Sequence, residues 1–376
     1  MKNLSKYKVD NGLLVALLLM AIVSITTIYS AEQLLPMAMH DLYIKQSIWF
    51  IIGFIVAYSI MSLGNEIIYK NVWLLYGLGI AMLLLLLIFG TPINGAKCWV
   101  MLPGIGSVQP SEFMKIILII TLAHTINNFN ERKKEPTVAE ELKFLTHIAI
   151  LVLIPTILTF LQPDTGMVII YLIITLVMLF ISGIRYGWFI FFFGSLILAL
   201  TVIISLYFFQ QDLFIKLFGT NLFYRLDRLL DWSSGIGMQL KNSITVIGAA
   251  GLTGYGFAKT PLYFPEPHTD FIFAVFSSNY GLIGSILLIA LLLFFNYQLL
   301  NLTTKNISNI NKYLIAGVFG MLVYQQIQSI AMTIGLLPIT GITLPFISYG
   351  GSSLLSYMIM IGIVFNISNQ SIRFTN

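Results

Sequence analysis

Residues 72–90 read VWLLYGLGIAMLLLLLIFG, without a single charged side chain. The core of a bilayer provides no water for backbone N–H and C=O groups. A chain that crosses it must therefore satisfy those groups internally, which a helix of about 20 mainly apolar residues does. This stretch predicts a membrane-spanning helix.

The rest of the chain has the same character. Of its 376 residues, 58% are hydrophobic and 9% are charged, whereas soluble domains average roughly 25% charged residues. The first apolar run could be read as a signal peptide, but it is long for such a segment. We expect an all-α polytopic membrane protein, a single domain over residues 1–376, with about ten transmembrane helices near 12–30, 44–63, 72–90, 111–127, 145–161, 165–182, 187–208, 270–295, 313–335 and 350–370.

The basic residues predict the orientation, because short cytoplasmic loops carry an excess of Lys and Arg. With both termini in the cytoplasm, the short outer loops hold only Lys45 and Lys97. The net charge of +5 is thus explained by topology and does not indicate nucleic-acid binding. The inner segments hold Lys2, Lys6, Lys8, Lys70, Arg132, Lys133, Lys134, Lys143, Arg185, Lys305, Lys312 and Arg373.

Cysteine and histidine give no sign of a metal centre. The single cysteine, Cys98, excludes an intrachain disulfide and a Cys-based metal cluster. The four histidines show no metal-ligand spacing on one helix face. Redox chemistry is therefore not expected.

One long outer segment, about residues 209–269, connects the seventh and eighth predicted spans. Loops of this length are usually functional or disordered. Residues 212–232 alternate apolar and charged side chains at helical spacing, which is typical of an amphipathic surface helix and also compatible with an ordinary loop. Residues 244–256 are glycine-rich, and we expect irregular backbone that dips back into the protein.

Charged residues inside a span are costly and invite a functional interpretation. Glu112 and Lys115 lie three residues apart, so they share a helix face and can neutralise each other. They could form a structural ion pair or a polar cavity wall. Asp164 could cap a helix or face the same cavity.

Residues 264–274 read FPEPHTDFIFA and place Asp270 at the entry to a span. Asp270 could cap that helix, but partial burial beside Phe271 and Phe273 would raise its pKa and suit it to proton abstraction. Residues 335–353 form a loop rich in Pro, Gly and Ser. This loop is either a simple turn or the lining of a binding site.

Four of these segments together resemble the SEDS family of shape, elongation, division and sporulation proteins, typified by RodA and FtsW. The matching motifs are QPSEFMK at residues 109–115, QPDTG at 162–166, PEPHTDFIFA at 265–274 and PITGITLPFISYGGS at 338–352. Four motifs in family order are far more specific than one short pattern.

The resemblance implies a ten-span glycosyltransferase of the bacterial cell membrane. Such an enzyme polymerises lipid II, the undecaprenyl-pyrophosphate-linked disaccharide pentapeptide, with a class B penicillin-binding protein as partner. Asp270 corresponds to the family's essential acid. Short termini look more like RodA, the elongation member, than FtsW. The candidate substrate-binding residues are Gln109, Ser111, Glu112, Lys115, Asp164, Arg225, Glu266, His268, Thr269, Ser348 and Ser352.

The reaction needs a base near the attacking hydroxyl and positive charge near the departing pyrophosphate. We expect Asp270 to act as the base in an inverting transfer. Lys115, or more weakly Arg225, would offset the phosphate charge. No cofactor is certain. A divalent cation, Mg²⁺ or Mn²⁺, could share this task, although the sequence shows no dedicated cage.

Two segments depart from the family pattern. Residues 277–281 read SSNYG where relatives usually have Gly-Glu-Glu-Leu-Gly. Residues 246–251 read VIGAAG where relatives often have Ala-Ile-Gly-Ser-Gly-Gly. These departures put a contribution from those positions in doubt.

Three other functions are compatible with the sequence. A lipid II flippase is the runner-up, since carriers also have many spans with buried charges. The absence of an inverted repeat, and acids gathered at one face, weigh against it. An enzyme for another undecaprenyl-linked glycan would differ in donor preference, and a non-catalytic scaffold of the elongation or division machinery would tolerate loss of Asp270.

Overall fold

The computed structural model describes residues 9–90, 97–102, 106–220, 237–305 and 307–375. Each of the ten apolar stretches lies largely within a helix. These long helices are α1 (Asn11–Glu32), α2 (Leu42–Leu63), α4 (Val72–Phe89), α5 (Pro110–Arg132), α6 (Val138–Phe160), α7 (Thr165–Ile181), α8 (Tyr186–Phe209), α12 (Ile272–Thr303), α13 (Asn309–Thr333) and α14 (Gly351–Thr375).

The remaining elements are short. A two-stranded antiparallel hairpin pairs Val100 with Val108. The short elements are a 3₁₀ turn (Met37–Met39), α3 (Asn65–Lys70), β1 (Val100–Leu102), β2 (Gly106–Val108), α9 (Gln211–Phe218) and α11 (Met238–Ala249).

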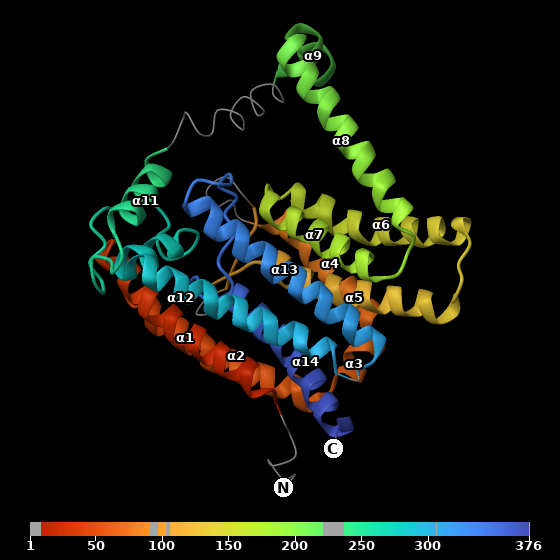
Figure 1. The fold of residues 1–376 in the computed structure, drawn as a ribbon, viewed down its shortest axis with the longest axis horizontal. Helices are drawn as coiled ribbons and strands as arrows, with labels where there is room; N and C mark the ends of the chain where they lie inside the picture. The colour runs from red at the N-terminus through yellow and green to blue at the C-terminus, as the bar shows by residue number, and fades with distance from the viewer. Residues whose placement is uncertain (1–8, 91–96, 103–105, 221–236, 306, 376) are drawn as a thin grey trace.

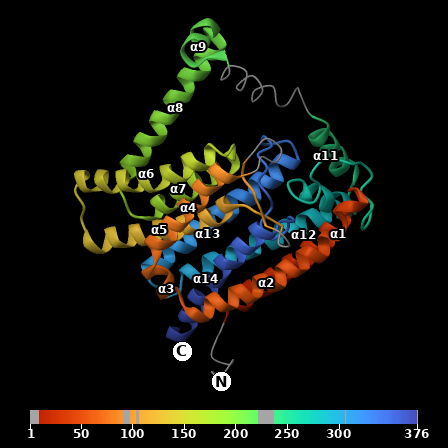
Figure 2. The ribbon, with the colours of Figure 1, turned by 180° about the vertical axis from the view of Figure 1, so that it is seen from behind.

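Eight of the described helices are long and apolar enough to cross a membrane, and α7 is a shorter apolar helix. α5 is more polar but lies against α4, α7 and α13. The expected class, a polytopic all-α membrane protein, is confirmed. The bundle is drawn from two sides in Figures 1 and 2, in which the helices run side by side.

The core of the bundle lies around α13 and α14, most of whose residues are buried. α14 packs along α2, α13 along α7 and α5, and α12 along α1. In contrast, none of the most apolar part of α8 is buried. Both views show α8 rising away from the other helices, with α9 at its far end (Figures 1 and 2).

Both ends of the chain lie at the same end of the bundle. The Asp10 side chain caps α1 by accepting from the N–H groups of Gly12 and Leu13. The Asp10 N–H in turn donates to the Ser368 hydroxyl at 3.0 Å, near the end of α14. This cap therefore ties the first helix to the last.

The long connecting segment differs from expectation in its second half. Residues 244–249 belong to the regular helix α11 and are not irregular backbone. Residues 250–256 follow α11 as a turn rich in glycine, called the glycine turn below, and this turn packs on α12. Of the predicted amphipathic helix, α9 covers the first part, and residues 221–236 lie outside the described residues.

α12 is broken at Gly281, whose φ of 62° and ψ of −159° are not helical. The break is held by the glycine turn: the N–H groups of Leu282 and Ile283 donate to the carbonyls of Gly251 and Leu252. A Cβ on Gly281 would lie 2.5 Å from the backbone nitrogen of Gly254. Glycine is thus required at this contact by both conformation and space.

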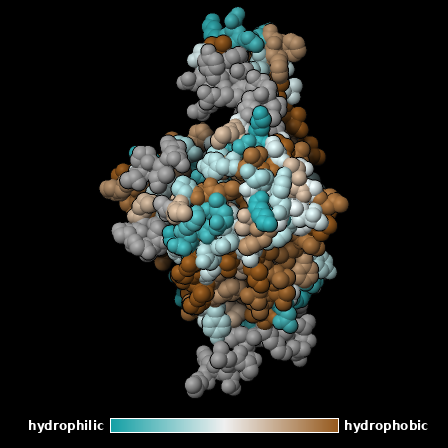
Figure 3. All heavy atoms as spheres, turned by 90° about the vertical axis from the view of Figure 1, so that its left-hand side faces the viewer, coloured by the Kyte–Doolittle hydropathy of each residue, from teal (hydrophilic) through white to brown (hydrophobic). Residues whose placement is uncertain are grey.

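The space-filling view of the face beside α11 shows how polar and apolar surface are divided (Figure 3). Hydrophilic side chains gather near the middle of this face, above a broad hydrophobic area. A cavity for a polar group is expected to open where such polar side chains gather.

Small residues allow the central helices to approach closely, as is common in membranes. We expect Gly362→Ala to destabilise the chain by about 1–3 kcal/mol, because overpacking a close contact forces the backbones apart. The new Cβ would lie 2.8 Å from the Ala57 carbonyl oxygen and 3.0 Å from its Cα. Thermal unfolding of the detergent-solubilised chain measures this effect.

Gly77→Ala is the matched control, since it lies within α4 and a Cβ there meets nothing within 4 Å. It should leave the unfolding temperature unchanged or raise it slightly. Equal unfolding temperatures for Gly362→Ala and Gly77→Ala would contradict the close α2–α14 contact.

Candidate functional site

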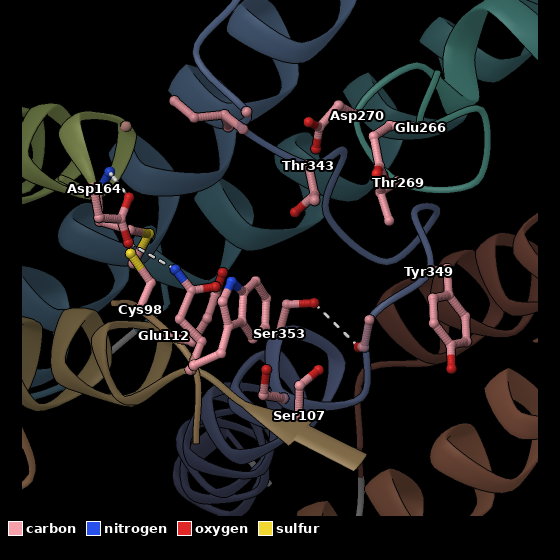
Figure 4. A pocket seen from close by; sticks show the side chains of 18 of the residues that line it. Cys98, Ser107, Glu112, Asp164, Glu266, Thr269, Asp270, Thr343, Tyr349 and Ser353 are labelled. Atoms are coloured by element: carbon pink, nitrogen blue, oxygen red, sulfur yellow. Dashed lines mark hydrogen bonds between the residues drawn. The ribbon is translucent and has the colours of Figure 1, made fainter. Parts of the chain in front are cut away.

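A cavity of about 500 Å³ lies where α5, α7 and α14 begin and where the chain enters α12. Four acids line it: Glu112, Asp164, Glu266 and Asp270. In Figure 4, Asp164 and Glu112 lie on one side of the cavity, and Glu266 and Asp270 lie on the other. Other lining residues include Trp49, Cys98, Trp99, Ser107, Gln109, His268, Thr269, Gln325, Tyr349, Ser352 and Ser353.

Glu112 and Lys115 form an ion pair one turn apart on α5. Lys115 is fully buried, and its Nζ lies 4.0 Å from the ring centre of Tyr357 on α14. The Ser356 hydroxyl donates to Glu112 Oε2 at 3.4 Å. The two interpretations are therefore compatible: the pair locks α5 against α14, and Glu112 also forms part of the cavity wall.

Asp164 likewise combines both expected roles. Its Oδ1 accepts from the Met167 N–H at 3.2 Å and caps α7. Its Oδ2 accepts from Gln109 at 2.7 Å and from the Ser111 hydroxyl at 3.2 Å, both at the start of α5. Burial raises the pKa of Asp164 above its usual range, and these hydrogen bonds oppose the rise.

Asp270 lies two residues before the start of α12 at Ile272, and the N-cap residue of this helix is Phe271, without a side-chain hydrogen bond. The capping role is therefore not what the structure shows, and the carboxylate faces the cavity. Burial, and secondarily the charge of Glu266, raise the pKa of Asp270 to about 7. A carboxyl group with such a pKa holds and releases a proton near neutral pH, which suits a general base.

The backbone around Asp270 is held in an unusual shape. Glu266 has a left-handed φ of 53°, a conformation that is costly for a residue other than glycine. Its carboxylate accepts from the Thr269 hydroxyl at 2.7 Å, and its carbonyl accepts from the Phe271 N–H at 3.1 Å. The turn over residues 266–271 thus fixes where the Asp270 carboxylate points.

A second loop, residues 335–350, supports this turn. The Ser348 hydroxyl donates to the Thr269 carbonyl at 2.7 Å and accepts from the Leu344 N–H at 2.9 Å. The Tyr349 N–H donates to the His268 carbonyl at 2.9 Å. The Pro/Gly/Ser loop therefore lines the site and also holds the Asp270 segment in place.

The predicted site residues divide into three groups. Three of these residues do not line the cavity, namely Ser111, Lys115 and Ser348. Each of the three bonds to the side chain or backbone of a residue that lines it. Arg225 lies outside the described residues. The residues that line the cavity are Gln109, Glu112, Asp164, Glu266, His268, Thr269, Asp270 and Ser352.

The electrostatics of the cavity are one-sided. Among the residues described, its lining has four acids and no Lys or Arg. His268 does not supply a cation, because burial lowers its pKa below the ordinary value. Lys115, expected to face the phosphates, instead neutralises Glu112 from behind the wall.

Several lining residues were not predicted, including Trp49, Trp99 and Gln325. The two tryptophans carry no charge and lie among other apolar residues, so the sequence gives no signal for them. Gln325 does have a signal, since Gln325, Gln326 and Gln328 interrupt an apolar span. Buried polar residues within a span are rarely without a role.

The departures from the family pattern lie away from the cavity. Asn279 bonds to the Ser30 hydroxyl of α1 and accepts from the Thr260 hydroxyl at 3.2 Å. The residues around it hold the glycine turn against the break in α12. Residues 277–281 thus fix the segment that leads to Asp270 and do not contact the cavity.

The described residues contain no group of three or more His, Cys, Asp or Glu side chains that could hold a metal ion. Mg²⁺ is nevertheless often bound by one or two carboxylates together with substrate phosphates. Glu266 lines the cavity and can supply one such carboxylate ligand.

Together, these features define a polytopic α-helical membrane protein with an acid-lined cavity at one end of its helices. The sequence matches the model of the FtsW/RodA/SpoVE family of cell cycle proteins over residues 10–373, and the chain belongs to this family. The resemblance to the SEDS family is therefore confirmed.

Curated relatives cover most of the chain. A probable peptidoglycan glycosyltransferase FtsW from Trichlorobacter lovleyi is 29% identical over 96% of this chain and 93% of its own length. The protein of the same name from Coxiella burnetii is 34% identical over 81% of this chain and 79% of its own length. Stage V sporulation protein E of Bacillus subtilis is 31% identical over 77% of this chain and 76% of its own length.

Solved structures share the fold. RodA from Thermus thermophilus matches with a TM-score of 0.70 and 25% identity, covering 96% of this chain and 97% of its own. A chain from a peptidoglycan synthase complex that coordinates polymerization and crosslinking matches with a TM-score of 0.78 and 24% identity, covering 96% and 98%. The second match supports the fold alone.

The buried pair allows a double-mutant test. We expect Glu112→Gln and Lys115→Met each to destabilise the chain by about 3–5 kcal/mol, because each leaves its partner charged and buried without compensation. The double variant should unfold at a higher temperature than either single variant, since it removes both charges. Thermal unfolding in detergent measures all four proteins.

Additive losses in the double variant would contradict direct pairing of the two side chains. Lys133→Met with Glu140→Gln is a matched control pair. It removes a contact of 2.6 Å between partly exposed side chains, and should change stability by less than about 1 kcal/mol.

Proposed function

We propose that this chain is a peptidoglycan glycosyltransferase that polymerises lipid II into glycan strands. The observation that carries the proposal is Asp270, a carboxyl group with a pKa of about 7 that faces an acid-lined cavity. Its family context supports the same conclusion, because relatives are named probable peptidoglycan glycosyltransferases. The reaction joins a sugar hydroxyl to the anomeric carbon of a second sugar and releases a pyrophosphate-linked lipid.

In this mechanism, Asp270 removes the proton from the acceptor hydroxyl as it attacks opposite the pyrophosphate, which inverts the anomeric centre. The position of Asp270 is set by the turn over residues 266–271 and by Ser348 behind it. Across the cavity, Glu112 and Asp164 offer groups that can bind sugar hydroxyls, as does Gln109, which is bonded to Asp164. The cavity thus has a reactive side and a binding side.

The departing pyrophosphate needs compensating positive charge, and the described lining has none. Arg225 is one proposed source, and a divalent cation, Mg²⁺ or Mn²⁺, that binds together with the substrate phosphates is the other. A bound divalent cation would supply Lewis-acid stabilisation of the pyrophosphate oxygens. Lys115 contributes indirectly, because it neutralises Glu112 and so lowers the repulsion that an anionic substrate meets.

The polyprenyl tail of the substrate needs an apolar route beside the cavity. An apolar groove of about 450 Å³ contains Met82, Leu85, Phe89 and Val100, and it shares Trp99 with the acid-lined cavity. An apolar groove that adjoins the polar cavity suits a lipid whose headgroup reacts and whose tail stays in the membrane. The groove faces the hairpin and the end of α4.

The proposed orientation places both termini in the cytoplasm and the cavity on the extracytoplasmic side of the bacterial membrane. α14 begins at the cavity with Ser352 and runs to the end where Ser368 meets Asp10. The cavity and the termini are therefore at opposite ends of the bundle. The lysine and arginine bias of the inner loops supports the assignment of the sides.

A class B penicillin-binding protein is the proposed partner, in the elongation or division machinery. This part of the proposal rests on membership of the SEDS family, whose members work with such a partner. The relatives carry the names of FtsW, RodA and a sporulation protein, so an elongation role like that of RodA stays a prediction.

We expect Asp270→Asn to abolish glycan synthesis, because the amide cannot accept the acceptor proton. The chain would be purified with its cognate class B penicillin-binding protein, supplied with labelled lipid II in liposomes, and scored for strands by gel. Asp41→Asn, an exposed residue with a left-handed φ of 72°, is the matched control and should retain activity.

The Asp270→Asn variant should also fold. With its pKa near 7 against about 3.9 when unfolded, Asp270 binds a proton in the folded chain between those values, so its ionisation costs stability as pH rises through that window. The amide removes this cost, and at pH 8 the variant should be at least as thermostable as wild type. Near-normal strands from Asp270→Asn would overturn the general-base role. Transbilayer movement of lipid II without strands would favour a flippase.

The pH dependence of polymerisation tests the same group differently. We expect kcat/KM to fall about tenfold per pH unit below pH 7, because Asp270 becomes protonated there. Glu266→Gln should move this acid limb to lower pH, since the Glu266 charge raises the pKa of Asp270. A limb centred near pH 4, or one unmoved by Glu266→Gln, would contradict the assignment.

A further inference from the structure

A second polar hollow lies on the outside of the helices, away from the acid-lined cavity. It has a volume of about 500 Å³ and is formed by α4, α5 and α6. Its deeper wall includes Thr125 and Phe144, both buried. The other lining side chains are Trp73, Asn128, Phe129, Arg132, Lys133, Glu140, Lys143 and His147.

The two sites lie at opposite ends of α5. Gln109 and Glu112 are at the start of this helix, and Arg132 is its last residue. A helix of 23 residues is about 34 Å long at a rise of 1.5 Å per residue. The second hollow is therefore on the other face of the membrane from the acid-lined cavity.

The charge of this hollow is the reverse of the first. Arg132, Lys133 and Lys143 line it with a single acid, Glu140. Lys133 pairs with Glu140 at 2.6 Å. In the described part of the chain, neither Arg132 nor Lys143 has a carboxylate within ion-pair distance.

Two of the neighbouring acids are already engaged, and Glu135 does not line the hollow. Glu131 accepts from Asn127 at 2.9 Å. Glu141 is buried and accepts from the indole N–H of Trp188 at 2.7 Å, with Arg185 at 3.7 Å. Two cations at the rim thus face a hollow without a matching anion.

Aromatic rings complete the site. Phe129 and Phe144 stack with their centres 4.1 Å apart. The centre of the Trp73 ring lies 6.4 Å from the ring centre of His124 and 6.3 Å from that of His147, and both contacts are edge-on. Trp73 is also half exposed at the start of α4, the position that tryptophan favours at the boundary between lipid and water.

The surface next to the hollow is apolar and exposed. Leu74 and Leu78 follow Trp73 along α4 and are 62% and 53% exposed, and Ile150 of α6 is 53% exposed. In a membrane these side chains contact acyl chains. A ligand in the hollow can therefore have an anionic head between Arg132 and Lys143 and a tail along α4 and α6.

We propose that this hollow binds the phosphate headgroup of an anionic phospholipid. Basic pockets between transmembrane helices are known to bind such headgroups. Membrane topology alone would explain basic residues on a cytoplasmic loop. It would not explain a hollow lined by aromatic rings next to them. The proposal is independent of the proposed glycosyltransferase function, because it involves none of the cavity residues.

Native mass spectrometry of the full chain in detergent tests this site. The probes are palmitoyl-oleoyl phosphatidylglycerol, the matching phosphatidylcholine and inorganic phosphate as a competitor. We expect phosphatidylglycerol to bind more tightly than phosphatidylcholine, and the variant Arg132→Gln/Lys143→Gln to lose roughly tenfold in affinity. Inorganic phosphate at the same concentration should not displace the lipid.

The matched control is Lys70→Gln/Lys134→Gln, which removes the same charge from exposed residues outside the hollow. This control should keep its affinity within about twofold. An equal loss in the control would reduce the effect to general surface charge, and equal binding of phosphatidylcholine or displacement by phosphate would exclude a lipid headgroup site. Unchanged unfolding temperatures show that both variants are folded.

Discussion

A polar cavity can exist in this apolar bundle because its buried charges are satisfied by groups of the protein itself. Lys115 is fully buried, and the carboxylate of Glu112 and the ring of Tyr357 together compensate its charge. Removing water from an ion costs several kcal/mol, so such a group persists only with close partners. The contacts of this pair with Tyr357 and Ser356 join α5 to α14, so two of the helices that begin at the cavity are fixed to each other.

The same constraint governs the irregular backbone at the cavity. Gln46 of α2 donates to the Ser348 carbonyl at 3.2 Å and accepts from the Gly350 N–H at 3.3 Å. Ser348 in turn bonds the turn that carries Asp270. Non-helical backbone within a membrane protein is tolerated where its polar groups find partners. Gln46 of α2 thus holds the loop over residues 335–350, and this loop in turn holds the turn that leads into α12.

The sequence was sufficient to predict the helices and most of the acids. Each long apolar run became a helix because hydrophobic length decides this in a bilayer. The direction of each side chain was harder to predict. Ser111, Lys115 and Ser348 share motifs with cavity residues but point behind the wall, because their facing depends on how neighbouring helices pack. Trp49 and Trp99 reach the cavity from segments whose composition gives no such signal.

The helix α11 was missed for a related reason. Glycines at residues 248 and 251 favour irregular backbone, yet packing on α12 overrides that preference up to Ala249. Only the glycines beyond it, which meet the break at Gly281, adopt positive φ. Local propensity decides where the chain can turn, and tertiary contact decides which of those positions it uses. The placement of Asp270 follows from this choice, because the segment from the turn to the α12 break encloses it.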